Sequence, residues 1–232
     1  MIREFVRNVL SPVALLDMEL EESTRNILLK SVKTNSHWLD VGCGLKPFES
    51  SFSHAASYMG IDVEVSGRDG GLKKPDKFFD GVHIPYEDEI FDGVLCTQVL
   101  EHVKELDLLL AECNRVLKVG GALVVTVPFV YREHEIPYDF RRFTSYGLMM
   151  NLSQHGFKVE SCLKYLSAIE TIATLFCVYI SNIGSRNKFM YVVIGCFVSF
   201  PVLRLSRLLA KFMPDSRDLF CGLVTCSVKI KS

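Results

Sequence analysis

The order of hydrophobic and polar positions predicts strands that alternate with helices through the middle of the chain. Short apolar runs typical of buried strands begin near residues 37, 58, 92 and 122. Between the last two, residues 101–118 carry apolar side chains at helical spacing, which predicts a helix packed on a sheet, and Gly120 and Gly121 are expected to cap its end. This alternation favours an α/β fold with a mainly parallel sheet.

The flanking segments add helices and two further strands. A helix is expected from 145 to 155, with Thr144 or Ser145 as its N-cap, and strands are expected at 157–163 and 220–230. The predicted organisation is a single domain over residues 1–232, composed of an N-terminal helical segment (1–33), a core (34–164), a hydrophobic helical insertion (165–217) and a final strand (218–232).

The insertion is the segment that such a core does not require. Residues 165–213 hold two apolar stretches that each fall at or below the roughly 20 residues needed to cross a bilayer. Arg204, Arg207 and Lys211 follow on one helical face, opposite several leucines. We interpret the segment as an interfacial or shallowly inserted hairpin on an anionic membrane surface; a soluble lid or dimer surface and a membrane-spanning pair are the alternatives.

Composition limits the other partners. The chain has 232 residues and a formal net charge of −1, so no global field attracts nucleic acid, and no nucleic-acid partner is expected. Eight cysteines include no C-x-x-C pair and no histidine at ligand spacing, which argues against a metal site and for free thiols in a reducing compartment. Charged residues interrupt the N-terminus, so no signal peptide is expected and the protein is predicted to be cytoplasmic, peripheral to the inner face of the cell membrane. The sequence does not indicate an oligomeric state.

The most informative motif is a strand that ends in two glycines, Gly42 and Gly44. Glycine has no Cβ, so such a turn lets backbone N–H groups approach a ligand closely. A dinucleotide-binding turn would have a third glycine where this chain has Pro47. Asp40 lies just before the turn, and its carboxylate favours a ligand that carries a positive centre.

Three later segments extend this motif in order. Asp62 ends the next apolar run and follows Asp40 by 22 residues, about the separation at which doubly wound folds place a ribose-binding acid. Residues 79–95 hold an acid followed by an Ile-Pro-Tyr sequence and then Phe-Asp-Gly-Val, and residues 97–103 contain Leu-Glu-His-Val.

Together these segments resemble the class I S-adenosylmethionine-dependent methyltransferases. The resemblance implies a Rossmann-like, seven-stranded, mostly parallel sheet with an antiparallel last strand, helices on both faces and the hydrophobic insertion between strands six and seven. It implies that S-adenosylmethionine is the cofactor, with its ribose on Asp62 and its adenine amino group on Asp80. The implied cofactor-binding residues are Asp40, Gly42, Cys43, Gly44, Asp62, Asp80, Gly81 and Gln98.

A polar segment at residues 132–144 is the candidate acceptor site. It is similar to segments of bacterial methyltransferases associated with surface-polysaccharide biosynthesis, which implies acceptor binding by Tyr138, Arg141 and Arg142. Histidine has a suitable pKa for a general base, and His134 and His102 are the two candidates. The alternative is a capped loop in which Arg141 or Arg142 pairs with an aspartate.

The expected reaction is O-methylation of a sugar or lipid-linked glycan. A small lipophilic acceptor such as a quinone precursor is the second candidate, because it would also explain the hydrophobic insertion. A non-catalytic cofactor-binding module on a membrane assembly is the third.

Overall fold

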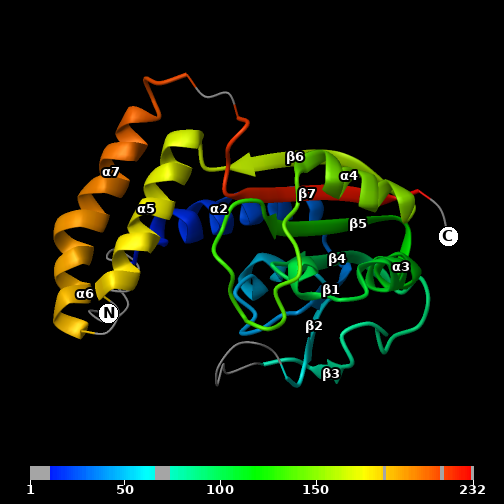
Figure 1. Ribbon diagram of the computed structural model, residues 1–232. Coiled ribbons are helices and arrows are strands. Elements are labelled where there is room, and N and C mark those ends of the chain that lie inside the picture. The colour runs from blue at the N-terminus through cyan, green and yellow to red at the C-terminus, as the bar shows by residue number, and fades with distance from the viewer. Residues whose placement is uncertain (1–10, 66–73, 185–186, 215–216, 231–232) are drawn as a thin grey trace. The chain divides into compact units, whose positions relative to one another are not determined.

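The computed structural model describes residues 11–65, 74–184, 187–214 and 217–230 (Figure 1). The chain divides into two compact units, each treated by itself below. The sheet unit comprises residues 23–163 and 222–232, and the helical unit comprises residues 1–22 and 164–221. The predicted insertion (165–217) thus lies in one unit with residues 1–22, whereas residues 23–33 of the predicted N-terminal segment belong to the sheet unit.

A seven-stranded sheet forms the centre of the sheet unit, in the order β3-β2-β1-β4-β5-β7-β6 (Figure 1). Strands β2, β1, β4 and β5 pair in parallel, whereas β7 is antiparallel to β5. The predicted fold class is therefore confirmed, including the antiparallel last strand, which lies between β5 and β6. The strands are β1 (His37–Val41), β2 (Ser57–Val63), β3 (Lys77–Phe79), β4 (Phe91–Thr97), β5 (Leu117–Pro128), β6 (Phe157–Tyr165) and β7 (Gly222–Lys229).

Helices cover the sheet. Figure 1 shows α3 (Leu106–Val116) and α4 (Ser145–Gln154) in front of the strands and α2 (Ala14–Ser31) behind them. The Thr144 side chain accepts the Gly147 N–H at 3.0 Å, so the predicted N-cap of α4 is confirmed. Two short 3-10 turns, η1 (Glu49–Phe52) and η2 (Leu100–His102), follow β1 and β4.

The core is packed tightly around β1. Trp38, Leu39 and Val41 are buried because both faces of a central parallel strand are covered. A Cβ at Gly93 of β4 would lie 2.4 Å from the Trp38 ring, so only glycine leaves room for the indole. This packing fixes the carboxyl ends of β1 and β4, where the candidate site lies.

The predicted helix at 101–118 is shorter than expected. Leu117 is fully buried and already pairs with Phe91, so it opens β5 instead of closing α3. Gly120 and Gly121 are therefore not helix caps. They lie inside β5, where Gly120 has φ of +81° and the register with β4 shifts. The predicted cap was wrong because apolar spacing does not distinguish the last helical turn from a buried strand.

The helical unit contains a hairpin. Helix α5 (Ala168–Gly184) is followed by α6 (Lys188–Ile194), a π-helical segment η3 (Gly195–Ser199) and α7 (Phe200–Leu209). The backbones approach closely at Gly184, where a Cβ would lie 2.7 Å from the Ile194 side chain. Asn187 caps α6 by accepting the Phe189 N–H at 2.9 Å.

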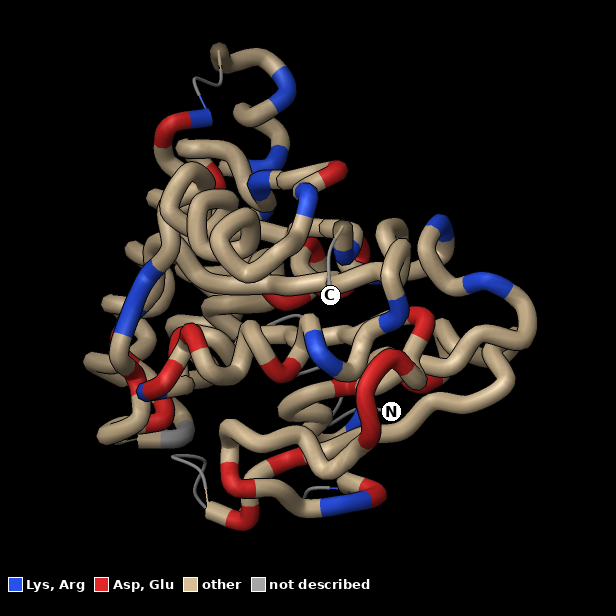
Figure 2. The backbone as a smooth tube through the Cα atoms, turned by 90° about the vertical axis from the view of Figure 1, so that its right-hand side faces the viewer, with Lys and Arg blue, Asp and Glu red and all other residues tan. Residues whose placement is uncertain are grey.

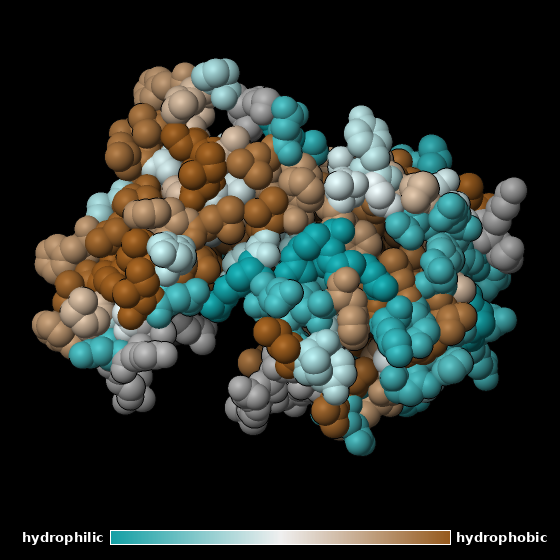
Figure 3. Space-filling view, in the orientation of Figure 1, coloured by the Kyte–Doolittle hydropathy of each residue, from teal (hydrophilic) through white to brown (hydrophobic). Residues whose placement is uncertain are grey.

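This hairpin is apolar on the outside. Ile172, Tyr179 and Phe197 have exposed fractions of 57%, 66% and 76%, and the visible face of the unit is mostly brown in Figure 3. The buried residues of α5 are Glu170, in its first turn, and otherwise small or weakly polar ones: Thr171, Ala173, Thr174, Cys177, Val178, Ser181 and Gly184. Among the described residues, Phe189–Leu209 is long and apolar enough to cross a membrane, and 28% of it is buried.

Candidate functional site

The glycine turn after β1 is built around a close contact. Gly42 has φ of +71°, and a Cβ at this position would lie 2.3 Å from Val99. The Gly42 and Cys43 N–H groups both donate to the Ile61 carbonyl, at 2.8 and 3.1 Å, which holds the turn against β2. Glycine at 42 is therefore required both by the backbone conformation and by the contact with Val99.

Asp62 connects the ends of β1 and β2. Its Oδ2 accepts the Gly44 N–H at 2.9 Å and its Oδ1 accepts the Val63 N–H at 2.7 Å. The carboxylate is buried and lines a cavity at the carboxyl edge of the sheet. Parallel sheets commonly present ligands at this edge.

Asp40 is buried one residue before the end of β1. Its Oδ2 accepts a hydrogen bond from the Tyr58 hydroxyl, while its Oδ1 has no hydrogen-bond partner among the described residues. Burial raises the pKa of Asp40 to about 7; the Tyr58 hydrogen bond opposes this shift, and the negative charge of Asp62 adds to it. The charge of Lys46 also opposes the shift, so the site holds a carboxyl group whose pKa stays raised by burial despite a nearby cation.

Replacing Asp40 with asparagine is expected to make the ligand-free protein more stable relative to wild type as pH rises. The folded-state pKa of about 7 lies above the ordinary value of 3.8, so the unfolded chain loses this proton first. The free energy of unfolding of the wild type therefore falls between about pH 4 and pH 7. Above pH 7 the loss caused by the ionised, buried Asp40 stays constant. The difference in free energy of unfolding should grow by up to roughly 3–4 kcal/mol across this window.

Urea unfolding at pH 4.5 and pH 8 measures this difference. Asp92→Asn is the matched control, because the pKa of Asp92 is lowered against the effect of its burial, chiefly by a hydrogen bond from Lys118. The pH window of Asp92 lies below its ordinary pKa of 3.8, so the difference between Asp92→Asn and wild type should change little between pH 4.5 and pH 8. An Asp40→Asn difference that is equal at both pH values would contradict the expectation.

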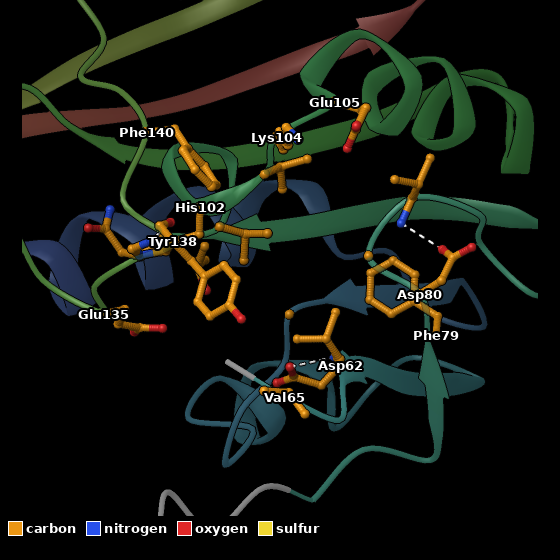
Figure 4. A pocket seen from close by; sticks show the side chains of 18 residues that line it. Asp62, Val65, Phe79, Asp80, His102, Lys104, Glu105, Glu135, Tyr138 and Phe140 are labelled. Carbon is orange, nitrogen blue, oxygen red and sulfur yellow. Dashed lines mark hydrogen bonds between the residues drawn. The ribbon is translucent and has the colours of Figure 1, made fainter. Parts of the chain in front are cut away.

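A cavity of about 320 Å³ opens beside these acids (Figure 4). Figure 4 shows Asp80 and Phe79 on one side, His102 and Tyr138 on the other, and Asp62 between them. Seven of the predicted site residues line the cavity: Gly42, Asp62, Asp80, Gly81, Gln98, His102 and Tyr138. The other six lie outside its lining: Asp40, Cys43, Gly44, His134, Arg141 and Arg142. The cavity is within the size range of small-molecule sites.

Several lining residues were missed by sequence reasoning. Val63, Phe79, Val82 and Val99 provide apolar walls, and Glu135 joins from the polar segment. Val63, Phe79 and Val82 could have been found from the sequence, because each lies within two residues of Asp62 or Asp80. Such walls are suited to a flat apolar ring beside polar anchors.

Asp80 is exposed and already engaged with its own turn. Its Oδ1 accepts the Val82 and His83 N–H groups at 2.8 and 2.7 Å, and its Oδ2 lies 2.7 Å from His83 Nδ1. The His83 side-chain hydrogen bond is the largest cause that lowers the pKa of Asp80 to about 2. The carboxylate is therefore ionised and oriented at the rim of the cavity.

Gln98 is held at the end of β4 in a left-handed conformation, with φ of +53°. Its backbone N–H donates to the Thr126 carbonyl at 2.9 Å, and its Nε2 donates to the Thr126 hydroxyl at 3.1 Å. β4 and β5 together therefore fix this amide where it lines the cavity.

The two candidate histidines lie together. The ring centroids of His102 and His134 are 4.7 Å apart, and His102 Nδ1 is 2.8 Å from the Tyr138 carbonyl oxygen. The neighbouring Glu101 is fully buried, which raises its pKa to about 8. Burial, followed by repulsion from His102, lowers the pKa of His134. The structure thus brings together the two residues that the sequence could only name separately.

The two arginines hold the polar segment in place. Arg141 donates to the carbonyls of Leu100, Val103 and Lys104, the last at 3.2 Å. Arg142 forms a two-pronged pair with Asp139 at 2.5 and 2.7 Å. These bonds favour the capped-loop alternative for both arginines, and their binding of an acceptor stays a prediction.

Charge on the surface is mixed. Acidic and basic positions are interspersed along the backbone in Figure 2, in keeping with the net charge of −1. The site therefore has to recognise its ligands through local groups.

The sequence of this chain is similar to those of known methyltransferases. Residues 39–125 match the family described as "Methyltransferase domain". A demethylmenaquinone methyltransferase of Staphylococcus saprophyticus is 30% identical over 123 residues, which cover 47% of this chain and 53% of that protein. An O-methyltransferase of Penicillium expansum is 32% identical over 145 residues, which cover 53% of this chain and 52% of that protein. The match thus spans about half the length of each relative.

The solved structures agree on the fold. A SAM-dependent methyltransferase from Methanosarcina mazei superposes with a TM-score of 0.54 at 15% identity, covering 89% of this chain and 98% of that one. The matched residues include the glycine turn, Asp62, Asp80 and η2. With the motifs, the sheet order and the family match in agreement, residues 39–125 lie in a methyltransferase domain, and the sheet has the fold of the class I S-adenosylmethionine-dependent methyltransferases.

Proposed function

We propose that the protein transfers a methyl group from S-adenosylmethionine to an oxygen of a sugar or lipid-linked glycan presented at a membrane. The observation that carries the proposal is one cavity lined by both the cofactor-type acids and His102 with Tyr138. A donor and an acceptor held in a single cavity can meet in the alignment that a direct displacement needs.

The residues present fit the cofactor. Gly42 leaves the turn open to a ligand, because any Cβ there would meet Val99. Asp62 would hold the ribose hydroxyls and Asp80 the adenine amino group, beside the apolar walls of Phe79 and Val82. Asp40 and Cys43 lie behind the turn and would act through its position and charge.

The bound cofactor would supply a methyl group already activated on a sulfonium. The chain's own residues then have to orient the acceptor, exclude water and accept a proton from its hydroxyl. His102 lines the cavity and is the first candidate to accept that proton. His134 stands behind it, with Nδ1 3.2 Å from Asp139 Oδ2. General bases of this kind contribute typically 10²–10⁴-fold.

The helical unit supports a membrane location. Apart from Glu170, which accepts hydrogen bonds from Ser167, α5 buries small and weakly polar residues, and the hairpin exposes large apolar ones, which is the arrangement of helices packed in lipid. Phe189–Leu209 has 21 residues, or about 30 Å of helix, close to the thickness of a bilayer core. Arg204 and Lys211 are exposed near its end and would contact anionic headgroups. A cytoplasmic protein bound at the inner membrane face is consistent with this surface.

Charge reversal of Arg204 and Lys211 to glutamate is expected to weaken binding to anionic vesicles. Two lost attractions of about 1 kcal/mol each correspond to at least roughly 30-fold in affinity. Arg207 is left unchanged because it pairs with Glu19 at 2.6 Å. Sedimentation with phosphatidylserine-containing vesicles measures the binding.

Lys30→Glu with Lys33→Glu is the matched control, since it reverses two exposed lysines in the sheet unit. Equal binding by both double variants, or indifference of the wild type to lipid, would favour the lid or dimer interpretation. Release by carbonate would favour an interfacial hairpin, and release only by detergent would favour a spanning one.

The acceptor is tested by analysing glycans and lipids from cells with and without the gene. Mass spectrometry should find acceptors in the deletion strain that lack the mass of one CH₂ group. A quinone precursor is the second candidate, because the demethylmenaquinone methyltransferase is among the relatives and the helical unit is apolar. A mass change confined to quinones would favour the quinone precursor as acceptor. The absence of a mass change in every fraction would contradict both proposed acceptors.

A further inference from the structure

Three side chains beside the cavity form a group that the general-base account leaves unexplained. Glu101, His102 and His134 each offer one ligand-type atom, and these atoms lie within 4.8 Å of one another. Glu101 is fully buried, whereas the side chains of His102 and His134 are 13% and 24% exposed. The group is therefore open only on the histidine side.

Several polar atoms of this group have no hydrogen-bond partner among the described residues, although His134 Nδ1 lies 3.2 Å from Asp139 Oδ2. Among the described residues, eleven buried side-chain polar atoms have no hydrogen-bond partner, and four of them belong to these three residues. Both Glu101 oxygens are included, and the distance from Oε1 to His102 Nε2 is 4.0 Å, too long for a hydrogen bond. Buried polar atoms without partners are rare, and a concentration of them calls for a bound species.

The hydrogen bonds around His102 expose a lone pair to the group. Its Nδ1 lies 2.8 Å from the Tyr138 carbonyl oxygen, which can only accept, so Nδ1 carries the proton. Nε2 of the neutral ring is then unprotonated. Histidines that bind metals usually donate their other N–H in this way, to a backbone carbonyl or a carboxylate.

We propose that Glu101, His102 and His134 bind a divalent transition-metal ion next to the cavity. One carboxylate oxygen and two imidazole nitrogens suit ions such as Fe²⁺, Mn²⁺, Co²⁺ or Zn²⁺. Tetrahedral ligand atoms about 2.1 Å from an ion are about 3.4 Å apart, so a pair of atoms 4.8 Å apart would have to close by about 1.4 Å. Side-chain rotation can supply a movement of that size.

The surrounding charges permit a cation. Arg142 is a positive group of the polar segment that acts on Glu101, and its charge is matched by Asp139 at 2.5 Å. Glu135 also contributes negative charge near Glu101. The sequence argument against a metal concerned cysteine ligands, and this group contains none.

An ion at this position would lie beside His102, which lines the cavity. A Lewis acid there would lower the pKa of an acceptor hydroxyl and orient it, so neither imidazole would need to take the proton. This catalytic consequence depends on the proposed function, whereas the binding of the ion does not.

Cobalt binding tests the site directly. The protein, freed of any affinity tag and treated with a chelator, is titrated with Co²⁺ and followed by visible absorption, with Zn²⁺ as competitor. One Co²⁺ per chain is expected, and Zn²⁺ should displace it. Glu101→Gln, His102→Asn and His134→Asn should each weaken binding at least about 10-fold. His54→Asn is the matched control, because His54 is an exposed histidine outside the group.

Each outcome is informative. Circular dichroism identifies a variant that fails to fold, and the more exposed His134→Asn then carries the test. Co²⁺ binding that is absent, or equally strong in all four variants, would overturn the metal site. Methyl transfer by protein that binds no metal would leave the proposed function intact. Metal binding without any methyl transfer would support the metal site and contradict the proposed function.

Discussion

Turnover by His134→Asn is expected to fall about 10²- to 10⁴-fold, with cofactor affinity unchanged. His134 contacts His102 ring to edge but does not line the cavity that would hold the cofactor. Asparagine removes the imidazole that contacts His102, the first candidate to accept the proton, and that would also hold the proposed ion. Affinity is measured by calorimetry with S-adenosylmethionine, and turnover by release of S-adenosylhomocysteine once the acceptor is known.

Two further variants make this result specific. His102→Asn should lower turnover at least as strongly, since His102 itself faces the cavity. His54→Asn should behave as wild type, because it removes an exposed histidine elsewhere in the sheet unit. A loss of only a few-fold in His134→Asn would show that alignment alone carries the reaction.

Asp62→Ala is expected to weaken S-adenosylmethionine binding by about 5- to 150-fold. The variant leaves two ribose hydroxyls unpaired, at a cost of roughly 1–3 kcal/mol. It also leaves the Gly44 N–H without the carboxylate that it donates to at 2.9 Å. Calorimetric titration of the two proteins gives the difference.

Loss of stability has to be separated from loss of contact in this variant. Asp92→Ala provides the comparison, because Asp92 Oδ2 also accepts a backbone N–H, from His37 at 2.8 Å, but does not line the cavity. It should lower the free energy of unfolding and spare affinity. Unchanged affinity in Asp62→Ala would refute the ribose assignment.

Much of the fold could be predicted because its signals are local. The glycine turn, Asp62 and the alternation of strands with a helix lie in short segments whose residues act on their neighbours. The boundary at Leu117 could not be predicted, because its burial depends on pairing with Phe91, 26 residues earlier. Apolar spacing is the same for a last helical turn and a first strand residue.

The site was predictable only in part, for a related reason. Glu101 appears in the sequence as one more acid in a helix start. The burial of its carboxylate, whose oxygens have no side-chain hydrogen-bond partner among the described residues, emerges only when β4 and the polar segment come together. Likewise, the sequence shows the apolar stretches of the helical unit, but it does not show that Thr171 and Thr174 lie on the buried face of α5. Composition shows what a helix contains, and packing decides which side is covered.

The bonds that join η2 to the polar segment restrict how this protein can change during evolution. Arg141 holds three carbonyl oxygens from residues 100–104, Phe140 donates its N–H to the Glu101 carbonyl, and the Tyr138 carbonyl accepts from His102. Two stretches nearly 40 residues apart thus form one wall of the cavity. Substitutions that adapt either stretch to a new acceptor would have non-additive effects with those in the other, because they share these contacts. A change of substrate would therefore require paired substitutions, one in each stretch.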